Sequence, residues 1–187
     1  MTRHVTRCAP EHDEAGAPQA IVQLRIDAEG DPRYWLHLEA RASAPLRQLD
    51  DLLRRTWLEC CGHMSSFREG ASELDMAKHL GSALSHKGAA ISYEYDFGST
   101  TALEAHVIGT RDGCLGSASI RLLARNDAID WRCTSCARPA VIACPFCIYD
   151  DDFLFCEAHA REHPCAEEEV YLPVVNSPRM GVCGYVG

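Results

Sequence analysis

The sequence predicts an α+β fold, in which a mostly antiparallel sheet carries its helices on one face, followed by a small cysteine-rich module. Three observations lead to this prediction. Several segments between residues 19 and 125 alternate between apolar and polar side chains, as half-buried strands do. One long segment among them has a helical period instead. Six of the 11 cysteines fall between Cys133 and Cys165, where the pattern of a hydrophobic core stops.

The first two strands are expected to form a hairpin. In residues 19–27, Val22, Leu24 and Ile26 share one face and polar side chains share the other. Residues 34–41 alternate in the same way, and the segment between the two strands is rich in turn residues. These features predict an antiparallel pair.

The spacing of leucines predicts a helix over residues 43–62, with Pro45 in its first turn and Gly62 just past its end. A weaker helical pattern covers residues 72–84 and is interrupted by Gly81. Further strands are expected over 91–97, 101–107 and 115–126.

These patterns divide the chain into four segments. We expect a flexible N-terminal tail at 1–18, an α+β domain at 19–125, a two-metal finger module at 126–170, and a C-terminal tail at 171–187 that packs on the core.

Composition and charge exclude several classes of protein. The net charge of −9 argues against a broad nucleic-acid-binding face, because such faces are rich in lysine and arginine. The first 18 residues lack the apolar run of a signal peptide, and no stretch is long and apolar enough to span a membrane. We therefore expect a cytoplasmic protein, in which closely spaced cysteines bind metal rather than form disulfides.

Eight residues have the spacing of zinc ligands. A Cys-x-x-Cys pair presents two thiolates to one tetrahedral ion from a single turn, and eight ligands supply two closed, structural sites. The segment is too short and too poor in large apolar residues to form a core without metal. We predict two Zn²⁺ per chain, with the ligands Cys133, Cys136, Cys144, Cys147, Cys156, His159, His163 and Cys165.

Two pairings of these ligands are compatible with the spacing. In a cross-brace, the first and third pairs share one ion, and the second and fourth pairs share the other. In a sequential layout, the four early cysteines hold one ion and the four late ligands hold the other. His159 and His163 are four residues apart, so that a helix would point both at one site.

The run RCTSC…CPFC…FCEAHAREHPC resembles the AN-one type zinc finger and its B-box relatives. This resemblance implies the cross-braced pairing, which we therefore favour. The surroundings of the ligands are acidic, with three arginines against eight carboxylates between Trp131 and Val170. Such a module is expected to brace the fold or contact a protein partner rather than bind nucleic acid.

Residues 19–125 resemble the plasmid pRiA4b ORF-3-like family, also described as transposon passenger proteins. The resemblance lies in the strand ISYEYDFG, in the stretch from Tyr34 to Phe67, and in the closing segment LPVVNSPRMGVCGY, which is similar to the tail of a zinc-bearing branch. It implies a compact α+β domain of a prokaryotic mobile element. Where many members carry acidic residues, a Trp and a His after the strand, this chain has residues 99–102, STTA.

Other candidate residues have less specific patterns. Glu94 and Asp96 on one strand face, with His63 or His106, are candidates for acid–base chemistry, although solvated or structural roles are favoured. Cys60 and Cys61 are expected to be buried thiols, and Cys183 a small residue in a tight turn.

No P-loop, G-x-S-x-G or G-x-G-x-x-G motif indicates an enzyme. We therefore favour a non-enzymatic, zinc-stabilised adaptor. The alternatives are a DNA-associated accessory factor of a mobile element, and an enzyme that uses Glu94, Asp96 and a histidine.

Overall fold

The computed structural model describes residues 2–150, 152–165 and 170–187. It divides into two compact units. Unit 1 comprises Met1–Arg55 and Met64–Asn126, and unit 2 comprises Thr56–His63 and Asp127–Gly187. The second boundary falls where core-forming sequence gives way to the cysteine-rich segment. Residues 171–187, which we expected to pack on the α+β core, are grouped with unit 2.

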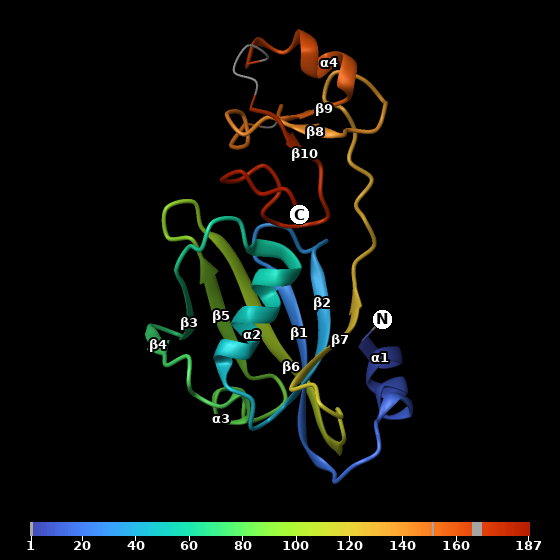
Figure 1. Cartoon of the computed structure of the whole chain (residues 1–187), viewed down its shortest axis with the longest axis vertical. Helices are drawn as coiled ribbons and strands as arrows, with labels where there is room; N and C mark the ends of the chain where they lie inside the picture. The colour runs from blue at the N-terminus through green and yellow to red at the C-terminus, as the bar shows by residue number, and fades with distance from the viewer. Residues whose placement is uncertain (1, 151, 166–169) are drawn as a thin grey trace. The chain divides into compact units, whose positions relative to one another are not determined.

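Unit 1 is built on a seven-stranded sheet in the order β4-β3-β5-β6-β1-β2-β7, in which neighbouring strands are antiparallel. Helix α2 lies across one face of this sheet (Figure 1). The predicted α+β class is therefore confirmed. The strands are β1 (Gln19–Ala28), β2 (Trp35–Arg41), β3 (Ser65–Glu69), β4 (Ser72–Leu74), β5 (Ala90–Tyr95), β6 (Thr101–Gly113) and β7 (Ile120–Arg125).

The hairpin of β1 and β2 forms in the register that the alternation requires. Leu24 pairs with Leu38, and Ile26 with Leu36, and all four side chains are fully buried. A slip of one residue would turn these side chains to the opposite face, so that their burial fixes the register.

The helices of unit 1 are shorter than predicted. The segment expected as one helix over 43–62 forms α2 (Leu46–Leu53) and then a single π-helical turn, η2 (Arg54–Leu58). Asp50 on α2 accepts hydrogen bonds from the Tyr93 hydroxyl at 2.7 Å and from Ser65 at 2.7 Å, and this fixes the helix to the strands beneath it.

The helix predicted over 72–84 is wrong for most of its length. Ser72–Leu74 is strand β4, which pairs with β3 after a turn at Gly70 (φ 59°), and only α3 (Leu80–Ala83) is helical. Gly81 lies against Ala42, where an added Cβ would come within 2.8 Å of the alanine methyl. The glycine that weakened the helical pattern is thus required by close packing.

The segment predicted as a flexible tail is structured. It forms α1 (Thr2–Cys8) and a 3₁₀ turn, η1 (Ala9–His12), with Val5 and Ala9 buried. Asp13 follows these elements and forms an ion pair with Arg111 of β6 at 2.6 Å. This long-range pair could not be read from the polar composition of residues 1–18.

A buried ion cluster joins β1, β2, β6 and β7. The side chain of Glu39 is completely inaccessible, and its carboxylate accepts hydrogen bonds from Gln23, Arg111 and Arg121 at 2.6–3.0 Å. Burial alone would raise the pKa of Glu39, but these donors outweigh burial and lower it. The cluster therefore depends on the ionised carboxylate.

Unit 2 has a three-stranded sheet, a short helix and long connecting segments (Figure 1). The sheet order is β10-β8-β9, with antiparallel pairs. Of the helices in the described part of the chain, none combines the length and the apolarity that crossing a bilayer requires. The elements of unit 2 are β8 (Ile142–Ala143), β9 (Leu154–Phe155), α4 (Glu157–Glu162) and β10 (Leu172–Pro173).

Substitution Glu39→Gln is expected to destabilise unit 1 by about 3 kcal/mol, because two arginines then remain near a neutral amide in a buried site. Urea unfolding followed by the far-ultraviolet circular dichroism of the sheet measures the change. Arg33→Gln is the control. It removes the arginine of the ion pair with Asp31, in which the arginine side chain is 54% exposed, and should lower the free energy of unfolding by less than about 1 kcal/mol.

The pH dependence provides an independent check of this prediction. A lowered carboxylate pKa contributes stability above the ordinary glutamate value, and this stability is lost as the pH falls through the lowered folded value. The difference in the free energy of unfolding between the wild type and Glu39→Gln should therefore become smaller in acid. Equal stability of the two proteins at pH 7 would contradict the proposed role of the cluster.

Candidate metal centres

The eight predicted ligands lie in two groups of four. Cluster 1 contains Cys133, Cys136, Cys156 and His159, and cluster 2 contains Cys144, Cys147, His163 and Cys165. In each cluster one candidate ligand atom from every residue lies within 4.8 Å of the others. The first and third ligand pairs come together, as do the second and fourth, so the cross-braced arrangement is confirmed and the sequential one is not formed.

Cluster 1 has the spacing of a tetrahedral site. The Cys136 and Cys156 sulfurs are 4.0 Å apart, and Nδ1 of His159 lies 3.3 Å from the Cys133 sulfur and 3.5 Å from the Cys156 sulfur. A tetrahedral zinc ion would separate two sulfur ligands by about 3.8 Å, and a sulfur from a nitrogen by about 3.5 Å. The observed distances leave room for one ion at the centre.

Cluster 2 repeats this geometry with the other imidazole nitrogen. The Cys147 sulfur lies 4.0 Å from the Cys165 sulfur and 3.4 Å from Nε2 of His163. The His163 ring stacks on Phe155, with 4.4 Å between the ring centres. Packing against an aromatic side chain holds the imidazole in the orientation that a ligand requires.

The two histidines point at different clusters because α4 ends between them. Cys156 immediately precedes α4 and His159 lies in its first turn, so both face cluster 1. His163 follows the helix with φ −71° and ψ 139°, which are extended values. Pro164 comes next in the sequence, and a proline disfavours the helical conformation in the residue before it. The pair His163-Pro164 was the sequence signal that decides between the two pairings.

Two similar turns present the Cys-x-x-Cys pairs. The Cys136 amide donates to the Cys133 carbonyl at 3.2 Å, and the Cys147 amide donates to the Cys144 carbonyl at 3.3 Å. The first turn is attached to β9 through Thr134, whose amide and hydroxyl both donate to the Leu154 carbonyl. The thiols thus lie on short loops that backbone hydrogen bonds hold in place.

The electrostatics of the clusters favour a bound cation. Burial and the neighbouring sulfurs of Cys144 and Cys165 raise the pKa of the Cys147 thiol to about 12, because thiolates so close together repel one another. At Cys133, burial is outweighed by hydrogen-bond donors that include the backbone amides of Cys156 and Ser135, and the pKa falls to about 7. A divalent ion stabilises all of these thiolates together.

Small apolar groups surround the clusters. Cys133, Cys144 and Cys156 are at most 5% exposed and pack with Phe155 and Ala160. A second buried group, Ala140, Ala143, Leu154 and Met180, extends this core into the C-terminal segment. The core of unit 2 is therefore small and includes the candidate ligands themselves.

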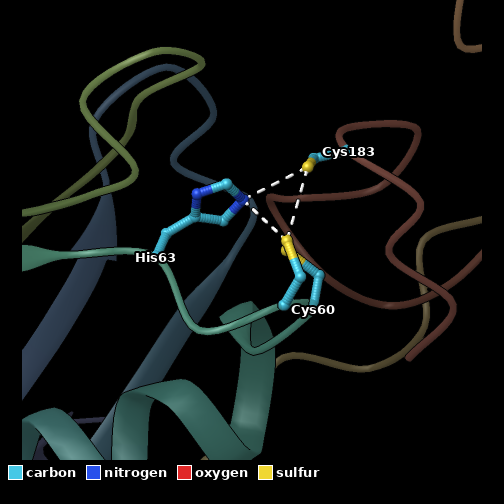
Figure 2. A group of neighbouring side chains, drawn as sticks. Cys60, His63 and Cys183 are labelled. Carbon is cyan, nitrogen blue, oxygen red and sulfur yellow. Dashed lines mark hydrogen bonds between the residues drawn. The ribbon is translucent and has the colours of Figure 1, made fainter.

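A third cluster, which the sequence analysis did not predict, contains Cys60, Cys61, His63 and Cys183. In Figure 2, Cys60 and His63 from one short segment and Cys183 from the C-terminal segment point toward a common region. Cys61 is exposed and Cys60 partly so, and the expectation of buried thiols is wrong. His63 was expected to be a structural histidine and Cys183 a turn residue. Nε2 of His63 lies 3.2 Å from the Cys183 sulfur. The pattern Cys-Cys-x-His at residues 60–63 was the local sequence signal for this cluster. The fourth residue of the cluster, Cys183, is 120 residues from His63.

Glu94, Asp96 and His106, three of the candidate acid–base residues, are not brought together on one strand face. Asp96 lies beyond the end of β5 in a left-handed conformation (φ 63°), and its carboxylate accepts the Gly98 amide at 3.1 Å. It therefore does not share a strand face with Glu94. His106 pairs with Glu104 at 3.1 Å and lies opposite Ala90, four residues or about 13 Å along β5 from Glu94.

Paired substitutions test the cross-brace. Because Cys133 and Cys156 belong to one cluster, replacing both with serine should lower the bound metal by one equivalent. Replacing Cys133 and Cys144, which belong to different clusters, should lower it by two. Native mass spectrometry of the intact chain counts the ions. The sequential pairing requires the opposite result, with the smaller loss in the Cys133/Cys144 protein.

Comparisons with known proteins add little to this description. No family model matches the chain, and no curated protein matches it. One solved structure that it is similar to is a crystal structure of a protein of unknown function from Methanosarcina mazei Go1. The match has a TM-score of 0.48 and 12% sequence identity, and covers 59% of this chain and 70% of the other.

Proposed function

We propose that this chain is a zinc-binding, non-enzymatic interaction protein whose C-terminal module holds two structural zinc ions. The supporting observation is that clusters 1 and 2 each bring three cysteines and one histidine to a single point. Zn²⁺ favours four-coordinate sites of sulfur and nitrogen ligands. The ligands Cys133, Cys136, Cys156 and His159 would hold one ion, and Cys144, Cys147, His163 and Cys165 the other.

A structural role for zinc follows from the donor sets. Four protein ligands fill a tetrahedral ion, so no position remains for a water molecule or a substrate. The small core of unit 2 also needs the free energy of metal binding, which amounts to about 10 kcal/mol or more in zinc-finger peptides. These sites support folding, and the separation of Glu94 from His106 along β5 favours a non-enzymatic role over an enzyme that uses this pair.

The surface of the module supports a protein partner. Phe146 lies inside the second Cys-x-x-Cys turn and is 56% exposed, and Tyr149, just after it, is 82% exposed. Aromatic side chains held on a rigid turn are typical anchors of protein interfaces. Acidic residues outnumber basic ones around them. The partner we propose therefore offers an apolar pocket with basic side chains at its rim.

The wider setting of this function rests on the sequence. We propose a reducing cytoplasm, consistent with eleven cysteines that form no disulfide. We also propose the prokaryotic mobile-element setting that the pRiA4b ORF-3-like resemblance implies. No observation favours the DNA-associated alternative over a protein-binding role, and the net charge of −9 opposes it.

Removal of metal is expected to unfold unit 2 and leave unit 1 intact. Elemental analysis of the reduced protein should find zinc, and a strong chelator should abolish the hydrogen-exchange protection of amides in residues 133–165. Amides of β1 and β6, which pair along ten positions, serve as the internal control and should stay protected. Unchanged protection of residues 133–165 in metal-free protein would contradict structural zinc.

The partner interface is tested by aromatic substitutions. Phe146→Ala and Tyr149→Ala should each weaken binding of a partner captured from the native host by about tenfold or more, with no loss of zinc. Phe97→Ala removes an aromatic side chain of similar exposure, 52%, from unit 1 and should leave affinity unchanged. Equal effects of all three substitutions would contradict this surface. A gel shift of duplex DNA that weakens steeply with salt would favour the accessory-factor alternative.

A further inference from the structure

We propose that Cys60, Cys61, His63 and Cys183 form a third zinc site, which attaches the C-terminal segment to residues 60–63. All four residues belong to unit 2. The inference extends the proposed function from two ions to three, but it rests on a separate group of side chains.

The geometry of this cluster is that of a four-ligand site. The Cys61 sulfur lies 3.7 Å from the Cys60 sulfur and 3.8 Å from the Cys183 sulfur, close to the separation of about 3.8 Å expected around tetrahedral zinc. Nε2 of His63 lies 3.0 Å from the Cys61 sulfur and 3.2 Å from that of Cys183. Figure 2 shows His63 and Cys183 pointing toward each other from different segments.

The donor set supports zinc in particular. The third cluster contains three cysteines and one histidine, which is also the composition of clusters 1 and 2. Soft thiolates with an imidazole in a tetrahedral arrangement favour Zn²⁺ over the harder magnesium and calcium ions, which prefer oxygen.

The backbone around the ligands is shaped to bring them together. The Gly62 amide donates to the Glu59 carboxylate at 2.6 Å, and Gly62 has φ 80°, so the chain reverses between Cys61 and His63. Cys183 has φ 49°, a left-handed conformation that is unfavourable in a residue other than glycine. A bond from its sulfur to a metal ion would offset this cost.

A buried arginine balances the charge of the proposed site. Arg179 is completely buried, and its guanidinium donates to the Cys60 sulfur at 3.6 Å. Three thiolates outweigh the charge of Zn²⁺ by one unit, and the arginine supplies the compensating positive charge. Cluster 1 has a similar partner, since Arg138 donates to the Cys136 sulfur at 3.4 Å.

Hydrogen bonds away from the ligands hold the two segments in place. The Ser177 hydroxyl donates to the Trp57 carbonyl at 2.6 Å and accepts the Arg179 amide at 2.9 Å. Trp57, Ser177 and Arg179 are each at most 1% exposed. The approach of Cys183 to residues 60–63 is thus supported by buried contacts, and the site is preorganised for its ion.

The competing chemistry is a disulfide. Two of these cysteines could join by losing two electrons and two protons to an oxidant, but a disulfide needs sulfurs about 2.05 Å apart. The sulfur distances of 3.7 Å and 3.8 Å fit ligands of a shared ion, and none of the cysteines that the structure describes forms a disulfide.

Zinc counting on the full-length chain tests the proposal. The chain is purified under reducing conditions, loaded with Zn²⁺ alone and freed of excess, and its ions are counted by native mass spectrometry. We expect three for the wild type, and two for Cys183→Ser and for His63→Gln. His63→Gln alters a partly exposed ligand on a loop, which guards against misfolding of the cysteine variant. Cys114→Ser, at a thiol outside the three clusters, is the control and should keep three.

The outcomes separate this proposal from the function on which it builds. Two ions in the wild type, unchanged by Cys183→Ser but lowered by Cys144→Ser, would overturn the third site and leave the two-zinc module standing. One ion, lost in Cys183→Ser and kept in Cys144→Ser, would support the third site and overturn the proposed module. A disulfide between Cys61 and Cys183 or Cys60, found by peptide mass spectrometry of the reduced preparation, would overturn the third site.

Discussion

The constraint on which unit 2 depends is the close approach of its cysteine sulfurs. In all three clusters, sulfurs lie 3.7–4.0 Å apart, with an imidazole nitrogen 3.0–3.5 Å from at least one of them. Without a cation, such neighbours repel once they ionise, as the raised pKa of Cys147 reflects. A divalent ion bound between the thiolates would offset this repulsion, because it attracts all of them at once and couples their approach to folding.

The two units are stabilised in different ways. Unit 1 has a conventional apolar core under a seven-stranded sheet, and its fully buried carboxylate, Glu39, is compensated by two arginines. Unit 2 has strands of only two residues, and its buried groups include the thiols themselves. Metal bound in the proposed sites would replace the apolar area that a larger core would bury.

Much of the architecture was predictable from local sequence. The alternation in residues 19–27 and 34–41 predicted β1 and β2 and their antiparallel pairing, because each segment places its apolar side chains on one face. The spacing of cysteines and histidines predicted the eight candidate ligands that lie together in clusters 1 and 2. The cross-brace was favoured through a resemblance, although His163-Pro164 contained the physical reason for it.

The remaining features depend on contacts between distant residues. Residues 72–84 have a helical pattern, but pairing with β3 makes their first part a strand. The N-terminal residues are ordered by an ion pair between Asp13 and Arg111, which are 98 residues apart. Cys183 was interpreted as a turn residue because it lies between glycines in the C-terminal segment. The buried contact of Ser177 with Trp57, 120 residues away, brings it to the third cluster.

The most direct test of this account is zinc K-edge X-ray absorption of the purified, reduced protein. Because every cluster contains three cysteines and one histidine, the account predicts four-coordinate zinc. It should have three sulfur ligands at about 2.3 Å and one nitrogen ligand at about 2.0–2.1 Å on average. A coordination shell dominated by oxygen and nitrogen, or a folded unit 2 that contains no metal, would contradict it.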